Sequence, residues 1–399
     1  MASPSQRPGT AEPRTAEPPS FLRLHGMKLA ASALITVTLV SLLRNAGMKF
    51  IPDAGCFAAV RWWTLPLYLV TLIGMNYFRA TRWRYLLRSV ADVPRRKLVA
   101  VSWIGFAAIL LMPFRIGEFV RPYMLRSAGK TDASGKTVGA ITVSTATGSV
   151  VAERVVDGLY LSLVLLVALL TVPTVSPLPD TVVGLHIPVE RVRQAGFSMP
   201  ILFGVAMIVI AVFYWARAFA HRATLAVFGI VSKPLAERLA KMAENLADGL
   251  HFLGKPRDAI PFLWETTLYW GLNALGMWIL AWGSGVTHAD GSIVTYGEAC
   301  ALMGMLGISI LIPGPPGMLG PFQLGIYAGM TMYFPTHTVV TEGAAYVFLL
   351  YAAQFVWTIA GALIFLVGDR QALRALEEAE GILPPPPPGE KLTPSSTVR

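Results

Sequence analysis

Three charged side chains stand close together directly after an apolar stretch of the chain. The segment PFRIGEFVRP, residues 113–122, holds Arg115, Glu118 and Arg121, and the apolar run LVAVSWIGFAAILLM precedes it. On a helix, positions three and six apart share roughly one face. A guanidinium fork binds phosphate through two parallel hydrogen bonds. The spacing therefore indicates a face that could bind an anion.

A second charged group lies further along the chain. The stretch VVAERVVDGL, residues 150–159, contains Glu153, Arg154 and Asp157. Glu153 and Asp157 are neighbours on one helix face, and Arg154 can pair with Asp157. Both charged groups are expected at the ends of apolar pieces on the same side of a membrane. We therefore expect that they can meet.

These charges need a physical explanation, because a charged side chain at the middle of a bilayer costs roughly 2.5–3.5 kcal/mol even on a lenient scale. Two compatible interpretations stay open. The charges form a headgroup site for an anionic lipid, or they form an ion-pair network that holds short helices together. The predicted substrate-binding residues are Arg115, Glu118, Arg121, Glu153, Arg154 and Asp157.

A proline- and glycine-rich stretch, IPGPPGMLGPFQLG, interrupts a later apolar region at residues 312–325. Proline removes backbone donors and glycine permits tight turns, so the stretch predicts a non-helical apex between short helices. We expect a mainly structural role here, with contact to substrate as a secondary role. The predicted helix-break residues in the two regions are Pro113, Gly117, Pro313, Pro316, Gly317, Gly320 and Gln323.

The composition indicates a polytopic membrane protein. Charged residues make up 14% of the 399 residues and hydrophobic residues 54%, whereas a soluble domain carries about 25% charged residues. The net charge of +10 is concentrated in short basic segments, 79–97 and 217–259, between apolar ones. That distribution follows the positive-inside rule, so nucleic acid is not the expected partner.

The apolar segments predict an all-α fold with about six full spans, at about 27–45, 57–78, 155–173, 199–216, 261–283 and 344–367. Region 98–152 must begin and end on the cytoplasmic side, and region 299–334 on the exported side. Each is expected to be a dipping hairpin, and the first could instead be two short complete spans. Two interrupted segments that enter from opposite faces are typical of inverted-repeat transporters.

Three parts of the chain are expected to behave differently. Residues 1–24 and 371–399 are predicted to be flexible tails, and 25–370 a transmembrane domain that includes a cytoplasmic amphipathic segment at 217–259. The protein is then expected in the cytoplasmic membrane, with both termini in the cytoplasm.

The sequence assigns no further chemical site. Whether Cys56 and Cys300 pair is left open. The stretch GKTDASGKT, residues 129–137, has five residues between its glycines where a phosphate loop needs four, so it is not expected to bind a nucleotide. No cofactor, metal or catalytic residue is assigned.

The motifs resemble those of a known family. P-x-R-x-G-E-x-x-R at 113–121, E-R-x-x-D at 153–157 and the later Pro-Gly-rich break are similar to the membrane domain of lysylphosphatidylglycerol synthases and to their stand-alone, flippase-like relatives. The resemblance covers about residues 25–370. One departure is Gln323, which stands where the family usually has a glutamate. The resemblance implies a stand-alone member without the soluble aminoacyl-transfer domain, and hence transport instead of aminoacylation.

The leading hypothesis is an integral membrane, flippase-like protein that moves or positions an anionic, polyprenyl-type or hopanoid-type lipid between leaflets. Arg115 and Arg121 would bind the headgroup phosphate, and the carboxylates would hold the arginines. The alternatives are a membrane-embedded transferase that uses Glu118 or Asp157 as a base, and a scaffold of a lipid-synthesis complex. The expected partners are membrane lipid, lipid-biosynthesis proteins and a second copy of the chain.

Overall fold

The computed structural model describes residues 51–88, 91–112, 117–125, 130–131, 137–138, 141–228, 255–311 and 316–368, together with single positions within 34–41 and 232–241. Several sequence-based predictions lie outside the described residues. They are both tails, nearly all of the span expected at 27–45, most of 229–254, and the residues Pro113, Arg115 and Pro313.

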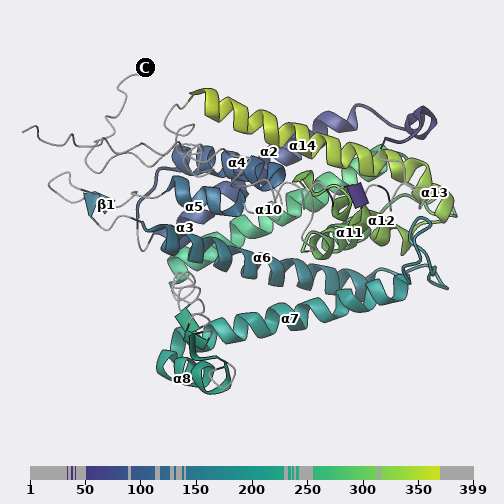
Figure 1. Cartoon of the computed structure of the whole chain (residues 1–399). Coiled ribbons are helices and arrows are strands. Elements are labelled where there is room, and N and C mark those ends of the chain that lie inside the picture. The colour runs from purple at the N-terminus through teal and green to yellow at the C-terminus, as the bar shows by residue number, and fades with distance from the viewer. Residues whose placement is uncertain are drawn as a thin grey trace, which may run out of the picture.

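The described residues form a helical bundle (Figure 1). The longer helices are α2 (Thr64–Thr81), α4 (Arg95–Leu111), α6 (Val143–Thr171), α7 (Val189–Trp215), α8 (Arg217–Phe228), α10 (Pro256–Gly283), α11 (Tyr296–Ser309), α12 (Pro321–Thr331) and α14 (Glu342–Gly368). The short ones are η1 (Ala54–Phe57), α3 (Trp83–Leu87), α5 (Val120–Met124), η4 (Pro316–Met318) and α13 (Thr336–Val340). Besides these helices, β1 (Lys130–Thr131) and β2 (Thr137–Val138) form one antiparallel pair. The predicted all-α class is confirmed.

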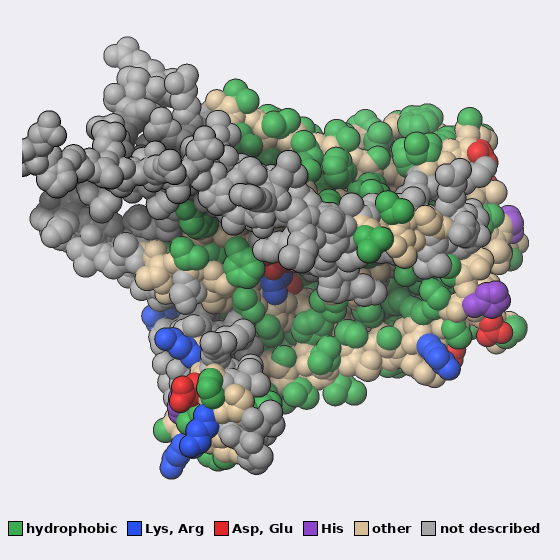
Figure 2. Space-filling view, viewed as in Figure 1, with side chains coloured by type: hydrophobic (Ala, Val, Ile, Leu, Met, Phe, Trp, Pro, Cys, Tyr) green, Lys and Arg blue, Asp and Glu red, His purple; other side chains and the backbone are tan. Residues whose placement is uncertain are grey.

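Three described segments are long and apolar enough to cross a membrane: Thr145–Thr171, Val189–Val209 and Thr336–Val367. The predicted number of spans stays a prediction. Large apolar side chains such as Val167, Ile201 and Ile364 are exposed on these segments, as lipid contact requires. Figure 2 shows mostly hydrophobic side chains over the middle of this face, whereas many of the charged side chains gather toward the left and right ends.

Two predictions about helix boundaries were wrong. The last part of region 98–152 and the span expected at 155–173 belong to one continuous helix, α6, so Glu153 and Asp157 lie inside it. The helix continues through Glu153 and Asp157, whose charges pair with Arg82 of another element. The basic stretch 79–97, expected as a loop, is mostly helical: α2 continues to Thr81, α3 follows, and α4 begins at Arg95.

The two interrupted regions form helical pairs at different places in the bundle. In Figure 1, α4 and α5 lie toward the left, and α11 and α12 toward the right. Each helix contacts its own partner, α4 also contacts η4, and α14 contacts both α4 and α12. The apex of the second break therefore reaches the first pair. Whether these pairs are re-entrant and related by an inverted repeat remains a prediction.

Close helix contacts depend on glycine at particular positions. A Cβ atom on Gly117 would lie 2.1 Å from the backbone carbon of Ala108 in α4. On α12, Cβ atoms at Gly325 and Gly329 would lie 3.0 Å from Leu306 Cα and 3.4 Å from Leu302 Cα of α11. Both helical pairs therefore pack backbone to backbone, which is the common use of small residues in membrane helices.

Candidate functional site: a buried arginine–carboxylate cluster

Arg82, at the junction of α2 and α3, is the centre of the charged cluster. It is fully buried, and its two terminal nitrogens bind both oxygens of Asp157 at 2.6 Å each. One nitrogen also binds Glu153 Oε1 at 2.8 Å, and the other donates to Thr266 Oγ1 at 3.1 Å. This bidentate arrangement is the strongest form of an arginine–carboxylate pair. Arg82 thus ties α2 and α3 to α6 and α10.

The carboxylate of Asp157 has further donors around it. Trp270 Nε1 donates to Oδ1 at 3.3 Å, and Arg154 Nη1 donates to Oδ2 at 3.4 Å. With Arg82 added, both oxygens carry two donors. A general base needs a free lone pair directed at its substrate, so Asp157 is better placed as the anchor of Arg82.

Arg121, in α5, enters the cluster from the other side. Its Nη1 donates to Glu153 Oε2 at 3.3 Å, and its guanidinium carbon lies 4.3 Å from the ring centre of Trp83 and 5.3 Å from that of Phe106. A Cβ atom on Gly105 would lie 2.2 Å from Arg121 Cγ. The glycine in α4 therefore makes room for this buried side chain.

Arg79 is the fourth arginine of the cluster. Its guanidinium carbon lies 3.9 Å from the ring centre of Phe106 and 5.9 Å from that of Tyr269. Arg82 is also close to the Tyr269 ring, at 4.8 Å. Aromatic faces attract cations and partly replace the water that burial removes.

Glu118 and Arg154 form the more open edge of the cluster. Their side chains are 22% and 21% exposed, and Arg154 Nε lies 3.9 Å from Glu118 Oε1, which is too long for a hydrogen bond. Figure 2 shows charged side chains of both signs in a recess in the middle of the apolar face, over α6.

The cluster has more donors than the surrounding protein satisfies. It contains four arginines and three carboxylates among the described residues, and six of its buried guanidinium nitrogens have no hydrogen-bond partner there. These nitrogens are Nε of Arg79 and Arg82, and Nε and Nη2 of both Arg121 and Arg154. In a guanidinium group, Nε and Nη2 form one edge, which can give two parallel bonds to a phosphate. In both Arg121 and Arg154 that edge has no hydrogen-bond partner among the described residues, and Arg154 Nε faces Glu118 only at 3.9 Å.

The structure brings together five of the six predicted substrate-binding residues: Glu118, Arg121, Glu153, Arg154 and Asp157. Arg115 lies outside the described residues. A loop was predicted for Arg79 and Arg82, but Arg79 lies in α2 and Arg82 is buried directly after it. Their spacing of three residues directly after an apolar helix is the signal that could have placed them on a continuing helix face.

The predicted helix-break residues of the second region have a local structural role. Gln323 is buried, and its Oε1 accepts a hydrogen bond from the Gly320 backbone N–H at 2.8 Å. Gly317 has a φ of 76°, and its carbonyl accepts from the Tyr351 hydroxyl at 2.8 Å. Both Cys56 and Cys300 are free thiols.

One comparison with known proteins identifies a family of membrane domains. A family model described as the lysylphosphatidylglycerol synthase TM region matches residues 28–361. A comparison with curated protein sequences finds no match, and a comparison with solved structures finds none either. The matched region includes every residue of the arginine–carboxylate cluster. The chain therefore belongs to the family of lysylphosphatidylglycerol synthase transmembrane regions, which are membrane domains.

Proposed function

We propose that this protein moves, or positions for movement, a phosphate-bearing lipid between the leaflets of the cytoplasmic membrane. In this proposal residues 25–370 form one transmembrane domain with both termini in the cytoplasm, as the basic segments indicate. The observation that carries the proposal is that the Nε–Nη2 edges of Arg121 and Arg154 are buried and have no hydrogen-bond partner among the described residues.

The two halves of the cluster would have different roles. Arg82 is held by two carboxylates at 2.6–2.8 Å and would form a fixed frame. Arg121 has one long contact to Glu153 at 3.3 Å, so it can exchange a carboxylate for a phosphate while Glu153 stays paired with Arg82. The Glu118–Arg154 edge, which is partly exposed, would admit the headgroup.

The same chemistry narrows the choice of cargo. A buried donor without a partner costs about 1–3 kcal/mol, and a phosphate satisfies two such donors at once. Anionic phospholipids and polyprenyl phosphates offer this group, whereas an unmodified hopanoid does not. We therefore favour a phosphate-bearing lipid. A second copy of the chain and lipid-biosynthesis proteins remain proposed partners.

A leaflet-exchange assay tests the proposal. Full-length protein is reconstituted into liposomes that contain fluorescent phosphatidylglycerol, and the fraction of the probe accessible to an external quencher is followed over time. Liposomes with wild-type protein should exchange the probe faster than protein-free liposomes. Arg121→Gln should show only a small part of this increase in exchange rate. Arg193→Gln is the matched control, because Arg193 pairs with Glu190 on the distant part of α7. Wild-type exchange equal to that of protein-free liposomes would count against transport.

A further inference from the structure

A second group of arginines lines a cavity of about 170 Å³ next to α3 and the start of α4. Three of its lining residues are Arg84, Arg88 and Arg95, and Asp92 is its acidic residue. A cavity of about 10–15 Å³ on this measure holds one water, so this cavity has room for a larger group. It shares no residue with the buried cluster.

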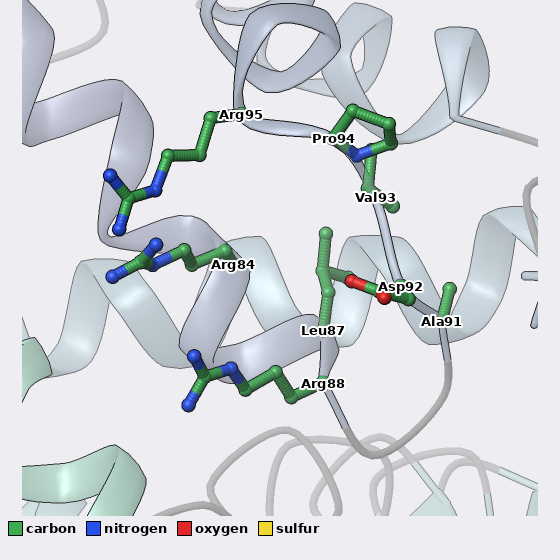
Figure 3. A pocket seen from close by; sticks show the side chains of 8 residues that line it. All are labelled: Arg84, Leu87, Arg88, Ala91, Asp92, Val93, Pro94 and Arg95. Carbon is green, nitrogen blue, oxygen red and sulfur yellow. The ribbon is translucent and has the colours of Figure 1, made fainter.

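The three guanidinium groups are arranged together at one side of this cavity. In Figure 3 they all extend toward the left, whereas Asp92 lies on the other side of Leu87. Arg84 lies 3.6 Å from Glu265, and Arg88 lies 2.5 Å from Asp258, both in α10. Arg95 forms no ion pair with any residue that the structure describes. The cavity therefore has a surplus of positive charge on one wall.

The beginning of α4 adds to this surplus. The helix starts with Arg95, Arg96 and Lys97, and its first turn contains no acidic residue. Pro94 precedes the helix and provides no side-chain cap. The first N–H groups of a helix carry partial positive charge and favour anions, so cations at this end are unfavourable without a counter-ion. An anion in the cavity would meet both the guanidinium groups and this helix end.

We propose that this cavity binds a phosphate group, with Arg84, Arg88 and Arg95 as its ligands. Arginine gives phosphate two parallel hydrogen bonds, and Arg84 Nε is buried without a partner among the described residues. The phosphate can come from the headgroup of an anionic lipid or from a soluble phosphate ester. The proposal does not depend on lipid transport, because no arginine of the buried cluster takes part.

Arginine-specific labelling tests the site directly. The full chain is placed in phosphatidylcholine nanodiscs and treated with a neutral phenylglyoxal reagent, and the labelling rate of each arginine is read by mass spectrometry of its peptides. One arm adds phosphatidylglycerol to the nanodiscs, and another adds glycerol 3-phosphate to the buffer. Arg96 is the internal control, because it is exposed in the same helical turn and does not line the cavity.

Labelling of Arg95 should slow about tenfold in at least one arm when the anion is present at roughly nine times its dissociation constant, since protection follows the fraction of occupied sites. Labelling of Arg96 should stay within about twofold, and Arg88→Gln should abolish the protection of Arg95. Protection by phosphatidylglycerol alone identifies a lipid headgroup, and protection by glycerol 3-phosphate identifies a soluble ester. Unchanged labelling of Arg95 in both arms, or equal slowing of Arg95 and Arg96, would overturn the proposal.

Discussion

The two interrupted regions differ in the chemistry of the side chains around them. At η4 and α12, neutral groups satisfy the broken backbone: Gln323 accepts from the Gly320 N–H, and the Tyr351 hydroxyl donates to the Gly317 carbonyl. Beside α4 and α5, the chain instead gathers Arg121 with three other arginines and three carboxylates. Irregular backbone inside a membrane needs partners, but the second region shows that these need not be charged. The charges of the first region pair mainly with one another, and we propose that they also serve to bind a ligand.

The largest expected effect comes from removing the centre of the charged region. Arg82→Ala leaves Glu153 and Asp157 buried with fewer partners, which typically costs about 3–5 kcal/mol. Thermal unfolding of the purified protein in detergent should show a much lower midpoint. Arg193→Ala, which removes a half-exposed ion pair, should change the free energy of unfolding by less than about 1 kcal/mol. Equal midpoints for the two variants would mean that the Arg82 network does not hold the helices together.

A smaller effect is expected from Gly105, which makes room for Arg121. Gly105→Ala forces the Arg121 side chain to move, and overpacking of this kind costs about 1–3 kcal/mol. Gly204→Ala is the matched control, because a Cβ atom there meets nothing within 4 Å. The control should be neutral or slightly stabilising, since alanine favours a helix. Thermal unfolding of both variants measures the difference, and a neutral Gly105→Ala would contradict the packing that we describe.

The smallest effect is expected in the neutral region. Tyr351→Phe removes one hydrogen bond to the Gly317 carbonyl and should cost about 0.5–1.5 kcal/mol in unfolding free energy. Lipid exchange should stay close to the wild-type rate, because the hydroxyl lies outside the arginine cluster. An exchange rate as low as that of Arg121→Gln would show that the neutral break takes part in binding as directly as the charged one.

The sequence predicted the two breaks and most residues of the cluster, and it failed where the partners are far apart in the chain. The helices expected at 261–283 and 344–367 end within a residue of α10 and α14. The motif at 153–157 looked like a helix end, because its neutralising partner, Arg82, is 71 residues from Glu153. Arg82 itself was expected in a loop, because the positive-inside rule considers charge and not pairing. The local sequence pattern identifies hydrophobic segments. Buried ion pairs depend on which helices pack together, and that is not visible in any one segment.

Native mass spectrometry of the purified full-length protein tests most directly whether the charged region binds phosphate-bearing lipid. Wild type and Gln323→Ala, which changes only the neutral region, should both retain a phospholipid. Arg121→Gln should retain about tenfold less, because it loses the open guanidinium edge. Equal amounts of bound phospholipid on Arg121→Gln and wild type, with both proteins folded, would contradict the account.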